Sequence, residues 1–199
     1  MTLLITGFEP FATVKENPSQ KIVEYIAAKK PSQIATQILP VDYQTAGEKL
    51  FAAIELYQPQ AVLLLGVAQK RKHIALERLA ININDARIPD NNGNLKTGQP
   101  IVENAPVGYW STLPLEAMYD AIAQTKIPVK YSNHAGAYLC NHVMYVALHH
   151  YATRGQADIP CGFVHVPGVE FVPVAQQIKA IEIAITIILE TITTLTPHQ

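Results

Sequence analysis

The chain has 199 residues, a formal net charge of −1 at pH 7 and a hydrophobic content of 49%. This length predicts one domain with a real core, and the near-neutral charge argues against nucleic acid or an anionic membrane as a partner. The two cysteines are typical of a reducing, cytoplasmic compartment, although a disulfide between Cys140 and Cys161 is an open alternative.

The first third of the chain alternates between short apolar runs and amphipathic segments. We expect strands in the apolar runs at residues 3–6, 34–39 and 60–65. The third run is almost wholly apolar, as in a strand covered on both faces, and it stops at Gly66. The first helix is expected to begin at Asn17, with Pro18 in its first turn. The second helix is expected to face inward through Leu50, Phe51, Ile54 and Tyr57.

The middle of the chain is less regular. Alternating apolar residues predict a strand over residues 73–84. Residues 85–114 predict an irregular arm, because they contain the turn signals at 89–93 and 98–100. A loop of this length is usually functional, disordered or in contact with another subunit. We expect the chain to form a homo-oligomer in which this arm contacts another subunit.

The last third returns to alternating elements. A helix is expected over residues 115–125, and an extended lead at 127–131 then runs through a turn into a helix that ends near Gly155. Residues 161–166 predict a strand, and Pro173 begins a last helix whose charged residues argue against a membrane anchor. Alternating strands and helices imply a single three-layer α/β/α domain over residues 1–199 with a mainly parallel, twisted sheet.

Cys140 falls in the first turn of one of these helices. Free N–H groups and the helix dipole favour an anion there, so we expect a lowered thiol pKa. In a strand–helix–strand unit, the next strand ends at the same sheet edge, which would bring His165 close to Cys140. A neutral histidine can take the thiol proton and later protonate a leaving amine. The alternatives are a buried core cysteine and a strand-end histidine with purely structural hydrogen bonds.

Glu77 is the candidate for a third group that orients the imidazole. It lies within an apolar run, where a carboxylate needs a partner. A local pair with Arg78, or a face exposed to water, is the alternative. We expect no metal and no cofactor, because no histidines have zinc-ligand spacing and the single glycines Gly7 and Gly66 do not form a phosphate-binding loop.

Four blocks of the sequence resemble the pyroglutamyl peptidase I (pyrrolidone-carboxyl peptidase) family of cysteine peptidases. They are residues 7–11 with 17–19, 77–82 with 85–91, 132–145, and 162–167. The resemblance implies that Cys140 is the nucleophile, His165 the acid/base and Glu77 the orienting group. It also implies that Phe8, Phe11 and Asn17 bind the substrate and that Arg87 assists at the oxyanion.

The activity implied by this resemblance is removal of N-terminal pyroglutamate (5-oxoproline) from peptides, by a dimer or tetramer. Two departures leave a weak or inactive pyroglutamyl-binding homologue as an alternative: Gln69-Lys70 and Ala12-Thr13 stand where family members often have Gly-Gly. A nucleoside phosphorylase can share this architecture, but the sequence lacks a glycine-rich loop with basic residues for the phosphate.

Overall fold

One seven-stranded sheet forms the centre of the computed structural model, which describes residues 1–12 and 15–195. The elements, in chain order, are β1 (Leu3–Phe8), α1 (Pro18–Ala28), β2 (Ile34–Leu39), α2 (Thr45–Tyr57), β3 (Ala61–Val67), β4 (Ile74–Ile81), β5 (Gly108–Trp110), α3 (Leu115–Ala123), β6 (Val129–His134), α4 (Leu139–Thr153), β7 (Cys161–Val166) and α5 (Val174–Leu195). The strand order is β2-β1-β3-β7-β4-β5, and β6 also pairs with β4. Strands β2, β1, β3 and β7 are parallel, whereas β4 is antiparallel to both β7 and β5.

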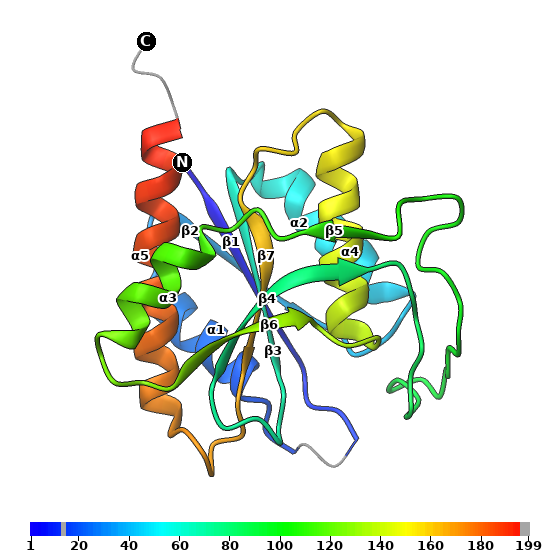
Figure 1. Ribbon diagram of the computed structural model, residues 1–199, viewed down its shortest axis with the longest axis horizontal. Coiled ribbons are helices and arrows are strands. Elements are labelled where there is room, and N and C mark those ends of the chain that lie inside the picture. The colour runs from blue at the N-terminus through cyan, green and yellow to red at the C-terminus, as the bar shows by residue number, and fades with distance from the viewer. Residues whose placement is uncertain (13–14, 196–199) are drawn as a thin grey trace.

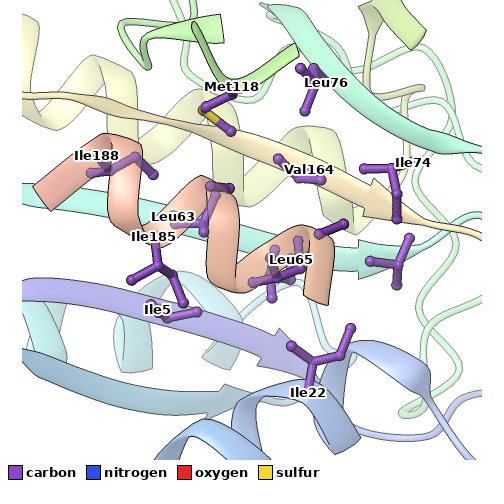
Figure 2. Close-up of a cluster of buried hydrophobic side chains, with 14 of the residues drawn as sticks. Ile5, Ile22, Leu63, Leu65, Ile74, Leu76, Met118, Val164, Ile185 and Ile188 are labelled. Carbon is purple, nitrogen blue, oxygen red and sulfur yellow. The ribbon is translucent and has the colours of Figure 1, made fainter. Parts of the chain in front are cut away.

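Helices cover both faces of the sheet, as Figure 1 shows. The side chains of a strand alternate between faces, so Leu63 and Leu65 of β3 enter the core under α1, α3 and α5, while Val62 and Leu64 enter the core under α2 and α4. Figure 2 shows the first core, where Ile185 of α5 lies over the sheet near Leu63. The expected three-layer α/β/α fold with a mainly parallel sheet is therefore confirmed.

The strand–helix–strand unit expected around Cys140 is wrong in its strand directions. β6 is parallel to β4, and β4 is antiparallel to β7, so the strands before and after α4 run in opposite directions. The start of α4 is fixed instead by Asn141. Its Oδ1 accepts a hydrogen bond from the N–H of Ile81 at 2.9 Å, and its Nδ2 donates to the carbonyls of Ile81 and Ile83. These bonds hold the helix N-terminus against the end of β4.

One smaller expectation also changes. Leu50 and Ile54 of α2 face inward, but the Tyr57 side chain is exposed because it lies at the helix end. The arm at residues 85–114 is irregular apart from the short strand β5. Asp90 organises its first turn, where the carboxylate accepts hydrogen bonds from the N–H groups of Tyr43, Asn92 and Asn94.

Candidate active site

Cys140 lies in the first turn of α4, directly over a glycine of β3. A Cβ atom added to Gly66 would lie 2.9 Å from the Cys140 Sγ and 2.7 Å from the Phe163 ring. Gly66 is also the register partner of His165 on the neighbouring strand β7. Because Gly66 has no side chain, the Cys140 sulfur can lie directly over β3, next to the position of His165 on β7.

His165 is joined to Glu77 across the β7–β4 junction. Its Nδ1 lies 2.7 Å from the Glu77 Oε1, and both side chains are buried. The same carboxylate oxygen accepts a hydrogen bond from Arg71 Nη1 at 2.6 Å. Glu77 thus has the partners that its position in an apolar run requires, and they are the buried His165 and the part-buried Arg71 rather than Arg78.

The charge of Glu77 fixes the proton on His165. Burial raises the pKa of the Glu77 carboxyl, but the contact with His165, and to a lesser degree those with Ser132 and Arg71, outweigh it, so the pKa lies below its ordinary value. An ionised carboxylate only accepts hydrogen bonds, so Nδ1 of the neutral ring carries the proton. Nε2 is therefore left as the basic nitrogen.

The expected low thiol pKa is contradicted. Burial and the negative charge of Glu77 raise the pKa of Cys140 to about 12, against smaller lowering effects from Arg71 and the backbone N–H of Cys140. The helix N-terminus acts in the expected direction, but desolvation of a thiolate is the larger effect. The resting group is therefore a thiol. Both Cys140 and Cys161 are free, so the disulfide alternative is also wrong.

A small apolar pocket of about 20 Å³ adjoins Cys140. It is lined by Phe8, Phe11, Asn17, Val41, Val67, Tyr138, Leu139 and Cys140. Three residues predicted to bind substrate are thus brought together with the cysteine. A larger groove of about 1000 Å³ lies where β3 and β7 begin, and its lining contains none of the predicted site residues.

Asn17 lines this pocket but uses its polar atoms to hold the surrounding loop. Its Oδ1 accepts hydrogen bonds from the N–H and hydroxyl of Ser19, and its Nδ2 donates to the Glu9 carbonyl at 3.0 Å. It also caps α1, as expected. These bonds tie the loop after β1, which includes Phe11, to the start of the helix.

Arg87 does not line the pocket together with the other predicted site residues. Its side chain is exposed. Its role at the oxyanion therefore remains a prediction from the resemblance alone.

Three residues at the site were missed by sequence reasoning. Gly66 interrupts an apolar strand, which is a signal for close approach of another group. Arg71 lies in a turn and gave no signal in the sequence. Tyr138 directly precedes α4, and its ring forms a pocket wall while its hydroxyl donates to the Pro89 carbonyl at 3.0 Å.

The two departures from the family pattern differ in their effect on the backbone. Gln69 and Lys70 lie in a turn closed by the Arg71 N–H and the Ala68 carbonyl, and neither has a positive φ, so glycine is not required there. Ala12 has φ of 47°, a left-handed conformation that favours glycine. Thr13 lies outside the described residues.

Within residues 1–12 and 15–195, no cluster of three or more His, Cys, Asp or Glu side chains could hold a metal ion. No helix in the same ranges combines the length and apolar character needed to cross a membrane.

Comparisons with known proteins agree with this geometry. The sequence model of the family described as Pyroglutamyl peptidase matches residues 1–195. The pyrrolidone-carboxylate peptidase of Brevibacillus brevis is 43% identical over 168 residues, covering 83% of this chain and 78% of that protein. The Pyrococcus furiosus protein of the same name is 43% identical over 169 residues, covering 84% of this chain and 81% of that protein.

A crystal structure of the Pyrococcus furiosus pyrrolidone carboxyl peptidase matches with a TM-score of 0.90 at 36% identity, covering 96% of this chain and all of that one. The chain belongs to the pyroglutamyl peptidase family.

Proposed function

We propose that this protein is a cysteine exopeptidase that removes N-terminal pyroglutamate from peptides, with Cys140 as nucleophile, His165 as acid/base and Glu77 as orienting group. The observation that carries the proposal is the position of the Cys140 sulfur over Gly66, beside the strand position of His165 and at the wall of a small apolar pocket. Family membership supports the same reaction.

Acylation begins from a thiol and a neutral imidazole. Nε2 of His165 takes the thiol proton as the Cys140 sulfur attacks the pyroglutamyl carbonyl carbon. Coupling the two events avoids a free thiolate, which burial and Glu77 disfavour. Because Glu77 holds the proton on Nδ1, Nε2 is the nitrogen that can act as the base, and the imidazolium that forms is stabilised by the carboxylate.

The N-terminus of α4 is suited to the negative oxygen of the tetrahedral intermediate. Among residues 1–12 and 15–195, no side chain caps this helix, in contrast to α1, which Asn17 caps. The first N–H groups of a helix have no partner within the helix, so those near Cys140 are free to donate to an oxyanion. Losing one such donor typically raises a barrier by about 3 kcal/mol.

Three proton transfers complete the reaction. The imidazolium of His165 protonates the departing amine as the peptide bond breaks, which leaves a thioester on Cys140. His165 then takes a proton from water, whose oxygen attacks the thioester. The thiolate that leaves regains this proton, and free pyroglutamate is released.

The pocket accounts for the choice of an uncharged ring. A lactam is compact and planar, and Phe8 and Phe11 can cover its faces, each contact adding about 0.5–1.5 kcal/mol beyond burial of area. An N-terminal glutamine or proline would instead bring an ammonium group into an apolar space, at a desolvation cost.

A pair of fluorogenic amides tests this function. The wild-type protein should release the reporter from the pyroglutamyl amide, without added phosphate, and should not act on the matched prolyl amide. Iodoacetamide or Cys140→Ala should abolish release. Equal turnover of both amides would overturn the proposed specificity. Calorimetric binding of a pyroglutamyl peptide without turnover would favour the inactive homologue instead.

The proposal also includes a cytoplasmic location and a homo-oligomer. Val107, directly before the short strand β5, and Trp110, the last residue of that strand, are 91% and 70% exposed. Large exposed apolar side chains on the arm are typical of a contact surface. Light scattering after gel filtration tests this directly: a dimer or tetramer is expected, and Trp110→Glu should shift it toward the monomer. A wild-type monomer at micromolar concentration would contradict the assembly.

A further inference from the structure

We propose that Arg71 is a positioning residue, which holds the Glu77 carboxylate in place behind His165 and balances its charge beside the Cys140 sulfur. The inference rests on the proposed function, because it concerns the same reaction. Sequence reasoning gave Arg71 no role, and its place in the site follows from the contacts below.

Arg71 reaches the site from a turn that follows β3. Its N–H closes this turn on the Ala68 carbonyl at 2.9 Å. Its Nη1 donates to Glu77 Oε1 at 2.6 Å, the oxygen that His165 also binds, and its Nη2 donates to the Ser132 hydroxyl at 3.1 Å. Ser132 is the register partner of Glu77 on β6. One guanidinium therefore spans β4 and β6 and fixes the oxygen that orients the imidazole.

The planar fork of arginine is needed for both contacts. A guanidinium presents several N–H groups in fixed directions, so it can bind a carboxylate and a hydroxyl at once. A lysine ammonium at this position would keep the charge, but it is a point charge without the rigid fork. The two roles of Arg71, charge and alignment, are therefore separable by substitution.

The charge balance extends to the nucleophile. In the described part of the chain, the charged and titratable groups that interact with Glu77 or Cys140 include Arg71, His73, His165, Tyr43 and Tyr138, and Glu77 itself acts on Cys140. Of these, Arg71 lowers the pKa of Cys140 while Glu77 raises it. The Arg71 side chain is 30% exposed, whereas the Glu77 side chain is fully buried. Without Arg71, the buried Glu77 carboxylate would lose the one lysine or arginine that pairs with it among the described residues.

The test uses three variants and two measurements. Arg71→Met removes both charge and fork, Arg71→Lys keeps the charge, and Lys72→Met is the matched control. The Lys72 ammonium lies 5.5 Å from the Phe171 ring centre, and no contact joins it to Glu77. The measurements are kcat and KM for a pyroglutamyl amide, and the rate of iodoacetamide alkylation of Cys140 against pH, followed by mass spectrometry.

Arg71→Met should lower kcat by about 10- to 100-fold with little change in KM, as small misplacements of a catalytic group do. Its alkylation profile should move to higher pH. Arg71→Lys should keep the wild-type alkylation profile but lose part of kcat, and Lys72→Met should match the wild type in both.

Wild-type kcat and alkylation in Arg71→Met would overturn the proposal. If this variant does not fold, wild-type kcat in Arg71→Lys overturns the alignment role, and an alkylation profile moved to higher pH overturns the charge role. A wild-type protein that hydrolyses no pyroglutamyl amide would refute the function. The alkylation profiles would still decide whether Arg71 controls the thiol.

Discussion

Nδ1 of His165 lies 2.7 Å from Oε1 of Glu77, although the two residues are not directly opposite in the sheet. His165 is paired with Ala75 on the antiparallel strand β4, and Glu77 lies two positions further along the same face. Such diagonal neighbours are about 7–8 Å apart at the backbone, a distance that a glutamate and a histidine can span together. The interaction thus depends on the antiparallel junction between β4 and β7.

Glu77→Gln should lower kcat by at least about 100-fold while the fold is retained. An amide can donate to Nδ1, which would favour the ring with its proton on Nε2 and remove the base. Turnover of a pyroglutamyl amide, with circular dichroism as the control for folding, checks this. A variant with wild-type kcat would show that Glu77 has no role in orienting His165.

Ala12→Gly should stabilise the protein by about 0.5–1 kcal/mol. The φ of 47° at Ala12 is left-handed, which costs a non-glycine residue about 1–2 kcal/mol. Glycine avoids this cost, but its greater freedom in the unfolded chain offsets part of the stabilisation. Urea denaturation of the two proteins measures the difference. Equal or lower stability of the glycine variant would contradict the strain at this position.

His142 should make the protein less stable as the pH falls from about 6.5 to about 4. Burial, and to a lesser degree the charge of Lys96, lower the pKa of His142 to about 4. Its ring lies against Tyr43, and its Nδ1 is 3.1 Å from the Asn84 Oδ1. Between the two values the unfolded chain binds a proton that the folded protein does not, so stability is full above the unfolded value and is lost below it.

The expected loss is about 3 kcal/mol over this range, because one pKa unit corresponds to 1.36 kcal/mol. Urea denaturation at several pH values between 7 and 4.5 measures it, and NMR titration of the His142 ring gives the pKa directly. His142→Gln should weaken this pH dependence, and the remainder would come from His73 and His150, whose pKa values burial also lowers. Asp42 and Asp90 also have lowered pKa values, but as carboxylates they lose stability only at still lower pH. A flat wild-type profile down to pH 4.5 would contradict the buried neutral histidine.

Elements with a strong local pattern could be predicted from the sequence. The apolar runs of β1, β2, β3 and β7 were identified close to their observed bounds, and so was the start of α1 at Asn17. Strand directions could not be predicted, because they depend on contacts between distant residues. The bonds of Asn141 to the backbone of Ile81 and Ile83 are of this kind, and no periodicity reveals them.

Part of the site could also be predicted from the sequence, where a residue lies at the end of a recognisable helix or strand. Cys140 and His165 follow from a helix start and a strand end, whereas Arg71 lies in a turn where an arginine usually faces water. The thiol pKa was predicted in the wrong direction because the helix N-terminus can be inferred from sequence, but burial and the closeness of Glu77 cannot.

Gly66→Ala should inactivate the enzyme, because the strand leaves no space for a methyl group. The new Cβ would lie 2.9 Å from the Cys140 Sγ and 2.7 Å from Phe163 Cζ, closer than real contacts allow. The sulfur must therefore move away from the position beside His165, and a displacement of about 1 Å can cost about 100-fold in rate. Overpacking should also lower stability by about 1–3 kcal/mol.

Gly47→Ala is the matched control for this substitution. Gly47 is a buried glycine in α2, but no other group lies within 4 Å of its added Cβ. Alanine favours a helix over glycine by about 1 kcal/mol, so this variant should be more stable and fully active. Turnover of a pyroglutamyl amide and urea denaturation of both variants give the comparison. If Gly66→Ala kept wild-type kcat, the sulfur would not need the space over β3, and the position of Cys140 on which the proposed reaction depends would be wrong.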